Sequence, residues 1–171
     1  AYDCEVAVGQ DLHNELTKGF KIYHDFPGGN FNIDHIAVGP TGVFAIETKG
    51  RSRAAKNENN NWVITFNGDY LIFPGWKEKR PIEQSKIQAN WLKQWIKKNT
   101  TEDVYVTPVL AFPHWLVTRK ASSEVLMYNG KNSKFLSERK EALSERQIAT
   151  ISAQIEKECR NIKGKSYKKK A

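Results

Sequence analysis

The segment between Phe31 and Lys49 constrains the fold of this chain more than any other part of its 171-residue sequence. Two largely apolar runs, Phe31–Val38 and Val43–Lys49, flank a Gly-Pro-Thr-Gly sequence at residues 39–42. Pro suits the second position of a type I turn and Gly suits the fourth. The segment therefore predicts a β-hairpin whose two strands belong to a sheet.

Helix and strand patterns follow one another along the rest of the chain, without an internal repeat or a long linker. The dipeptide Asn67-Gly68 is a strong signal for a second hairpin turn. This order of elements predicts an α/β protein with a mixed central sheet flanked by helices. We expect helices over Glu5–Leu16, Pro81–Lys98 and Ser144–Ile162, and further strands over Phe20–Phe26, Trp62–Phe66, Tyr70–Phe73, Val104–Phe112 and Glu124–Tyr128.

The net charge of the chain is concentrated at its end. The sequence has 27 Lys and Arg against 19 Asp and Glu, which gives a net charge of +8. Residues 163–171 hold five Lys and no acid, and we expect this basic tail to be disordered. Residues 1–162 have the length and the apolar content of a single domain.

Several features exclude membrane, secreted and metal-ribbon classes. No apolar run approaches the roughly 18 residues that a membrane span needs. The first residues have neither the basic flank nor the apolar stretch of a signal peptide. Cys4 and Cys159 form neither a metal-ligand spacing nor a disulfide framework. We therefore expect a cytoplasmic protein with no membrane partner.

The second strand of the hairpin ends in two charged residues, Glu47 and Lys49. Residues two apart in a strand point to the same face, so these two side chains lie together. Apolar residues lead directly into the pair, and charged groups are rarely buried unless they have a partner or a function.

Asp34 lies on the first strand of the hairpin, and its partner depends on the length of the turn. If residues 40–41 form a two-residue loop, Asp34 stands opposite Glu47. A three-residue loop with a bulge at Gly42 would place it opposite Thr48 instead. We favour the first register on functional grounds, because two repelling carboxylates make a hard oxygen site for a divalent cation such as Mg²⁺.

Two helices each begin their predicted core-facing stripe with a polar residue. Residues separated by three, four, seven and eleven positions share one helix face. We therefore expect Glu5 and Gln84 to point along the sheet toward the carboxylates. The stripes are Glu5, Val8, Gly9, Leu12 and Leu16 in the first helix, and Gln84, Ile87, Gln88, Trp91 and Trp95 in the second.

Together these residues resemble the nuclease-related domain (NERD) family, which is grouped with the PD-(D/E)xK nuclease superfamily. The resemblance covers about residues 5–112 and is most specific between residues 33 and 49. Ile33 stands where the superfamily name has Pro, a position that varies within the superfamily. The resemblance is carried by Glu5, Ile33-Asp34-His35, the turn and strand from Gly39 to Phe44, Ile46-Glu47-Thr48-Lys49 and Pro81-x-x-Gln84.

The resemblance implies a restriction-endonuclease-like core that hydrolyses phosphodiesters with a metal ion. Asp34, Glu47 and the backbone carbonyl of Thr48 would be the Mg²⁺ ligands, with Mn²⁺ as a substitute. Lys49 would orient or deprotonate the attacking water and stabilise charge on the phosphate. A cation is chemically suited to this reaction, because it neutralises the anionic phosphate and generates hydroxide near pH 7.

The same resemblance assigns supporting roles to two further residues. Glu5 would hold a second metal ion or its waters, and Gln84 would position the catalytic lysine or the substrate backbone. The loop after the second strand carries Arg51, Arg53 and Lys56, which we expect to contact phosphates. An ordinary basic loop is the alternative for these three residues.

Other residues with reactive or aromatic side chains receive structural interpretations. His35 follows Asp34 and points to the opposite face, so we expect it to be structural. We assign Trp62, Trp76 and Trp115 to the core, with stacking on unpaired bases as the less favoured alternative.

We conclude from the sequence that the chain is a Mg²⁺-dependent endo- or exodeoxyribonuclease. The alternative is a non-catalytic nucleic-acid-binding module that retains the nuclease fold. A hydrolase that acts on sugars with paired carboxylates is a third option. The adjacent Lys49 and the lack of an evident aromatic groove near Glu47 count against it. If the chain is part of a larger protein, a partner domain such as a helicase is compatible with this interpretation.

Overall fold

A computed structural model describes residues 2–52 and 62–170, with the backbone alone for residues 162–170. Its helices are α1 (Tyr2–Glu15), α2 (Arg80–Thr100), α3 (Glu145–Lys170) and the short 3₁₀ helix η1 (Ser133–Leu136). Its strands are β1 (Lys21–Pro27), β2 (Asn32–Gly39), β3 (Gly42–Thr48), β4 (Val63–Phe66), β5 (Leu71–Phe73), β6 (Trp76–Glu78), β7 (Val106–Ala111), β8 (Leu116–Arg119) and β9 (Leu126–Tyr128).

The main sheet is mixed and has the strand order β1-β2-β3-β7-β9. The first three strands are antiparallel, and β7 and β9 join them in parallel pairing. In the β2–β3 hairpin, Gly39 pairs with Gly42 and His35 pairs with Ile46. The predicted two-residue loop is therefore confirmed. The printed pairing ends at His35 and Ile46, the residues next to Asp34 and Glu47.

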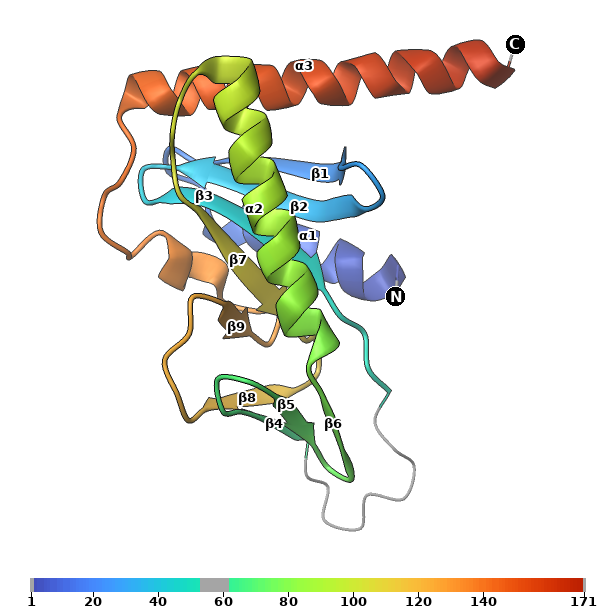
Figure 1. Ribbon diagram of the computed structural model, residues 1–171, viewed down its shortest axis with the longest axis vertical. Helices are drawn as coiled ribbons and strands as arrows, with labels where there is room; N and C mark the ends of the chain where they lie inside the picture. The colour runs from blue at the N-terminus through green and yellow to red at the C-terminus, as the bar shows by residue number, and fades with distance from the viewer. Residues whose placement is uncertain (1, 53–61, 171) are drawn as a thin grey trace.

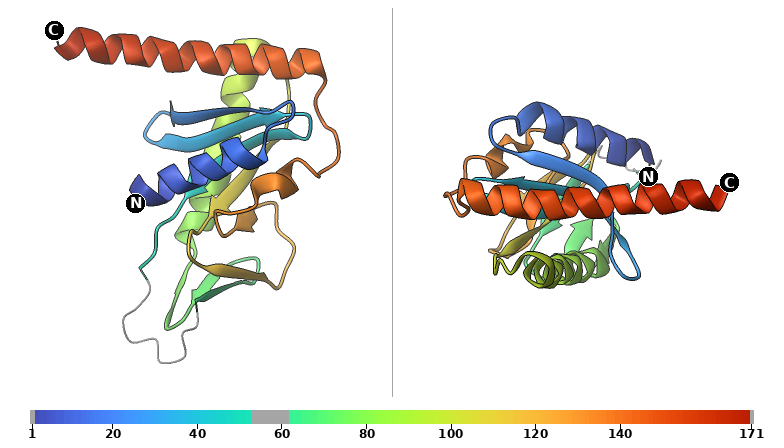
Figure 2. Two further views of the ribbon diagram at one scale, coloured as in Figure 1. Left: turned by 180° about the vertical axis from the view of Figure 1, so that it is seen from behind. Right: turned by 90° about the horizontal axis from the view of Figure 1, so that it is seen from above.

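Helices cover both faces of the main sheet (Figures 1 and 2). α1 lies on one face, where its buried residues Val8 and Leu12 join a core with Phe44 and Ile46 of β3. α2 lies on the opposite face, and α3 crosses near the β1 edge with Ile151 in that second core. The predicted fold class is thus confirmed, and the arrangement is consistent with a restriction-endonuclease-like fold.

A second sheet, with the order β6-β5-β4-β8, extends the molecule beyond the ends of β3 and β7. β4, β5 and β6 pair as an antiparallel meander, whereas β4 and β8 are parallel. Its inner face packs Ile64, Phe66 and Leu71 against Trp115 in a third core. The predicted 67–68 hairpin is confirmed, but β6 and β8 fall in segments for which we predicted no strand.

The last helix is longer than the sequence pattern predicted. α3 continues through Lys170, and residues 163–170 therefore belong to a helix rather than to the disordered tail that we expected. Lysine is a good helix former, which explains why a basic end extends the helix. Length alone does not make a membrane helix, and no helix within residues 2–170 that the structure describes is both long and apolar enough to cross a membrane.

Candidate active site

The alternation of side chains along β2 breaks at Asp34. Ile33 and Ile36 are both buried in the core on the α2 side, although residues three apart in a regular strand point to opposite faces. On the neighbouring strand, Asp25 lies across from Asp34 and has φ of 51°, in the left-handed region. This distortion places Asp34 where the regular β2–β3 ladder ends.

At this point the Asp34 side chain replaces the backbone of β2 as the partner of β3. The Thr48 N–H donates a hydrogen bond of 2.9 Å to Asp34 Oδ2. On the other side of β3, the Lys49 N–H still donates to the Ala111 carbonyl of β7 at 2.9 Å. The end of β3 is therefore held between a backbone ladder and a carboxylate.

Glu47 and Lys49 form a partly buried ion pair at the same strand end. Lys49 Nζ lies 2.9 Å from Glu47 Oε1, and the two side chains are only 19% and 13% exposed. Glu47 Oε2 is buried and, among the residues that the structure describes, has no hydrogen-bond partner. An unpaired buried polar atom costs about 1–3 kcal/mol, and more when it is charged. This oxygen is therefore the natural position for a bound ligand.

The electrostatics of Asp34 reflect its crowded acidic surroundings. The pKa of Asp34 is raised to about 7, mainly by burial and to a smaller extent by the nearby Glu47 and Glu5. The hydrogen bond from Thr48 and the positive charge of Lys49 oppose this shift. The structure thus brings Asp34, Glu47, Glu5 and Lys49 within electrostatic range of one another.

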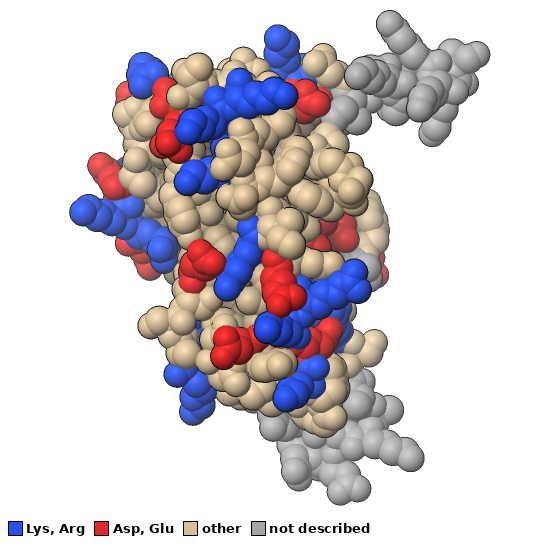
Figure 3. Space-filling model, in the orientation of Figure 1, with Lys and Arg blue, Asp and Glu red and all other residues tan. Residues whose placement is uncertain are grey.

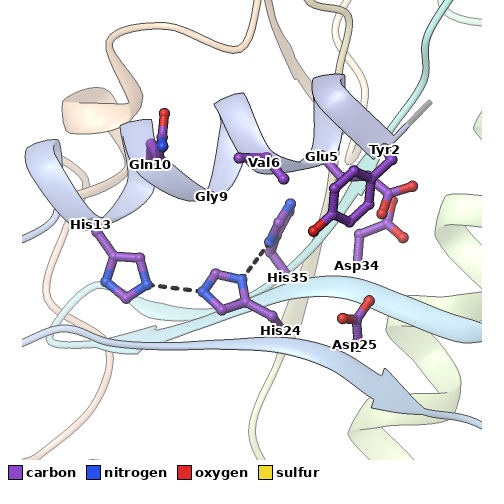
Figure 4. Close-up of a pocket in the computed structure, with 10 residues that line it drawn as sticks. All are labelled: Tyr2, Glu5, Val6, Gly9, Gln10, His13, His24, Asp25, Asp34 and His35. Carbon is purple, nitrogen blue, oxygen red and sulfur yellow. Dashed lines mark hydrogen bonds between the residues drawn. The ribbon is translucent and has the colours of Figure 1, made fainter.

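Glu5 reaches this group from the first turns of α1 (Figure 4). It lines a cavity of about 280 Å³ between α1 and the sheet, together with Asp34, Asp25 and Tyr2. The predicted stripe of α1 is confirmed, since Val8, Gly9 and Leu12 are buried beneath the helix. Glu5 stands at the end of that stripe, beside Asp34, as the sequence predicted.

Three histidines form a chain at the other end of this cavity (Figure 4). His13 Nε2 and His24 Nε2 are 2.9 Å apart, and His24 Nδ1 and His35 Nδ1 are 2.7 Å apart. Burial and His24 lower the pKa of His35 to about 4, and burial also lowers the pKa of His24. These shifts favour the neutral forms of His24 and His35, and the chain joins α1 to β1 and β2. The expected opposite orientation of Asp34 and His35 is wrong, since both line this cavity where the alternation of β2 breaks, and the structural role of His35 stays a prediction.

The core-facing stripe predicted for Gln84 and its helix is confirmed only in part, since Gln88 is buried and Trp91 and Trp95 pack against the core. Gln84 is half-buried on α2, and no hydrogen bond joins it to Asp34, Glu47, Lys49 or Glu5. The predicted stripe is wrong at Ile87, which is 61% exposed. A neighbouring stripe of α2 faces the sheet instead. Its side chains are smaller than the two tryptophans, so the helix can lie closer to the sheet. That buried stripe includes Ile82, Ser85, Ala89, Leu92 and Ile96.

The basic residues that follow β3 are placed only in part. Arg51 Nε and Nη2 each donate a 2.9 Å hydrogen bond to the carboxylate of Glu78, so the guanidinium already has a partner. The Trp115 indole N–H also donates to the Arg51 carbonyl. Arg53 and Lys56 lie outside the residues that the structure describes. Glu78 and the histidine chain went unnoticed in the sequence because their partners are 27 and 11 residues away.

The oxygen donors at the end of β3 suit a hard cation. Among the described residues Glu47 Oε2 is buried without a hydrogen-bond partner, and burial makes the charged form of the Asp34 carboxylate costly. Two carboxylates and a backbone carbonyl are oxygen ligands of the kind that Mg²⁺ prefers. Within residues 2–52 and 62–170, no group of three or more His, Cys, Asp or Glu is arranged to hold a metal ion. The fit therefore rests on the two carboxylates and the strand backbone.

Comparison with known families gives one result. The model of the nuclease-related domain family matches residues 1–113, about two thirds of the 171-residue chain. This match spans α1, the β2–β3 hairpin, α2 and β7, and it covers every residue of the candidate site. No curated protein and no solved structure matches the chain.

Proposed function

The chain belongs to the nuclease-related domain family, and we propose that it is a metal-dependent nuclease that cleaves DNA. The observation that carries this proposal is the buried, unpaired Glu47 Oε2 beside Asp34 and Lys49. Buried polar groups are nearly always hydrogen-bonded, and this carboxylate oxygen, which has no partner among the described residues, is suited to bind a cation.

The carboxylates would form the metal site. Asp34, Glu47 and the carbonyl of Thr48 would hold Mg²⁺, and Mn²⁺ would substitute for it. The bound ion would neutralise charge on the scissile phosphate and lower the pKa of a coordinated water. Binding would also relieve the repulsion that raises the pKa of Asp34.

Lys49 would act on the attacking water and on the phosphate. Its Nζ donates to Glu47 Oε1, which keeps the ammonium within a few ångströms of the proposed metal ligands. From there it would orient the water and place positive charge where negative charge develops in the transition state. Glu5 would hold a second ion or its waters, and Gln84 would contact the substrate backbone.

A cleavage assay tests this function. Plasmid, linear duplex, single-stranded DNA and RNA would each be incubated with Mg²⁺, Mn²⁺ or EDTA. We expect cleavage of DNA with either metal, none in EDTA, and a loss of about 10²–10⁴-fold in Lys49→Ala. Lys98→Ala serves as the control, because Lys98 is an exposed lysine near the end of α2.

Each other outcome counts against a stated part of the proposal. Full activity in Lys49→Ala would overturn the role of this lysine. Cleavage in EDTA would overturn metal dependence. An absence of both cleavage and metal binding would favour the non-catalytic nucleic-acid-binding module.

A further inference from the structure

The edge strand β6 and the start of α2 carry an exposed group of one aromatic and three basic residues. Trp76, Lys77, Lys79 and Arg80 are all exposed, and we call them the β6 edge surface. In the described part of the chain β6 pairs with β5 alone, so its other edge is not covered by a strand. Figure 3 shows Lys and Arg side chains gathered over β6 and the beginning of α2, with acidic side chains among them.

This surface adjoins the candidate active site. Arg51 lies two residues after Lys49, and its two hydrogen bonds to Glu78 tie that segment to β6. The hydrogen bonds from Arg51 lower the pKa of Glu78, and the positive charge of Lys49 lowers it further. The end of β3 and the β6 edge surface are therefore within electrostatic range of each other.

The acidic side chains near this surface are too few to neutralise its basic side chains. Glu78 is already engaged by Arg51, and Glu83 lies 3.6 Å from Lys79. In the part of the chain that the structure describes, Lys77 and Arg80 form no ion pair, and Lys77 Nζ lies 4.5 Å above the Tyr70 ring. The surface therefore has positive charge available for an anionic partner.

Trp76 adds a flat apolar surface to these charges. Its ring stacks on Phe73 with centroids 4.6 Å apart and an angle of 6°. This contact fixes the ring from one side, while the residue remains 37% exposed. Trp115, in contrast, is only 2% exposed, and Trp62 is half-buried. Of the three tryptophans considered from the sequence, Trp76 is the one that can stack on an outside group.

We propose that the β6 edge surface binds a single-stranded segment of nucleic acid that leads into the active site. Lys77, Lys79 and Arg80 contact the phosphates, and an unpaired base stacks on Trp76. Trp76 pairs with the buried Phe73 and Lys77 pairs with the exposed Ile72, so the ring and this lysine lie on opposite faces of β6 and the bound strand crosses the open edge of the sheet. Cations and an exposed aromatic ring together are the combination that binds single strands, because bases within a duplex have their faces covered. The identification of the partner rests on the proposed nuclease function, and the position of the surface rests on its charges and its aromatic ring.

Binding can be measured separately from cleavage. Fluorescence anisotropy of a labelled 12-nucleotide oligothymidylate in EDTA would report the binding affinity in the absence of metal and of cleavage. The double variant Lys77→Ala/Lys79→Ala should bind more weakly, and the slope of log affinity against log salt should fall by about 1.4, or about 0.7 for each single-strand phosphate contact. Lys97→Ala/Lys98→Ala is the matched control, because Lys97 also lies 3.6 Å from an acid, Asp103.

The aromatic contact needs its own variants. Trp76→Ala should lose about tenfold in affinity for the single strand, in the range reported for the loss of one stacked base. It should lose much less for a 12-base-pair duplex. Trp76→Phe should retain most of the affinity, because it keeps both an aromatic face and the stacking on Phe73. Circular dichroism spectra would confirm that each variant is folded.

The results separate this inference from the proposed function. If the double variant binds with the same affinity and salt slope as its control, the phosphate contacts are overturned. If Trp76→Ala weakens both strand types equally or neither, the preference for single strands is overturned. Wild-type cleavage with either of these results would leave the nuclease function intact. An absence of both binding and cleavage in the wild type would overturn both proposals.

Discussion

Asp34 and His35 are adjacent in β2, both are largely buried, and burial shifts their pKa values in opposite directions. The pKa of Asp34 is raised to about 7, and that of His35 is lowered to about 4. Each shift favours the neutral form, as burial requires. The surroundings differ, because His35 continues a chain of imidazoles whereas Asp34 faces Glu47, Glu5 and Lys49.

The difference underlies our proposal that the carboxylate cluster is the one that takes a ligand. Burial lowers the pKa values of His24 and His35, and two hydrogen bonds join the three rings, although His35 Nε2 has no hydrogen-bond partner among the described residues. Among the same residues Glu47 Oε2 also lacks a partner, and Asp34, whose pKa burial raises to about 7, lies within electrostatic range of Glu47, Glu5 and Lys49. A divalent cation would offset the repulsion between the carboxylates, which is why we assign the function to them.

The largest expected effect distinguishes the two clusters by activity. Glu47→Gln keeps the size of the side chain but removes a metal-ligand charge, and we expect cleavage to fall by about 10³-fold or more. His24→Gln disrupts the histidine chain and should change the rate by less than about threefold. Both rates would be measured at saturating Mg²⁺. Equal losses in the two variants would mean that the clusters do not differ in function.

The pH dependence of stability sharpens the comparison. Between pH 6.5 and 4 the unfolded state protonates His35 and the native state does not, so this residue makes stability fall on acidification. Its contribution is at most about 1.4 kcal/mol per pH unit. Urea unfolding in EDTA at pH 7, 6 and 5 would measure the free energy of unfolding. This free energy should fall less on acidification in His35→Gln than in the wild type. An unchanged slope would place the acid sensitivity elsewhere.

Asp34 should act in the opposite sense. Its raised pKa means that the native state takes up a proton between about pH 7 and 3.8 while the unfolded state does not, so stability rises on acidification. In Asp34→Asn the free energy of unfolding should therefore fall more steeply on acidification than in the wild type. At neutral pH the metal-free variant should be more stable by about 1 kcal/mol, or about 3 °C in melting temperature. If Asp34→Asn is less stable than the wild type at pH 8 in EDTA, the buried negative charge that we assign to Asp34 is contradicted.

The smallest expected effect concerns Thr48. Its hydroxyl is buried without a hydrogen-bond partner among the described residues, whereas its proposed metal contact is through the backbone carbonyl. Thr48→Val replaces the hydroxyl with a methyl group of similar size. We expect it to stabilise the protein by about 0.5–1 kcal/mol and to leave Mg²⁺ affinity unchanged. A clear loss of metal affinity would assign the side chain, rather than the carbonyl, to the site.

Local patterns in the sequence predicted the part of the site that one hairpin builds. Alternation along one strand placed Glu47 beside Lys49. Turn chemistry left two registers open for Asp34, and the observed pairing of Gly39 with Gly42 agrees with the register that we favoured on functional grounds. The position of Glu5 followed from the apolar stripe of a single helix. The roles of these residues in catalysis remain predictions that the experiments above test.

Long-range contacts explain what the sequence did not reveal. The parallel pairing of β4 with β8 joins short strands that are about 50 residues apart, and strands of three or four residues carry little periodicity. The face of α2 was misjudged because Trp91 and Trp95 pack at the margin of the core against Phe26 and Phe31. Their spacing from Gln84 put them on the predicted stripe, whereas Ala89, Leu92 and Ile96 lie on the buried face of α2.

Calorimetric titration of Mg²⁺ and Mn²⁺ into the wild type and Glu47→Gln tests the central claim most directly. Glu83→Gln is the control, because it removes an exposed acid from α2. The wild type should bind metal, with affinity that falls below about pH 7 as Asp34 takes up a proton. Glu47→Gln should lose at least about 100-fold in affinity, and the control should not. Equal affinity in all three proteins, or no binding in the wild type, would contradict a metal site at the end of β3.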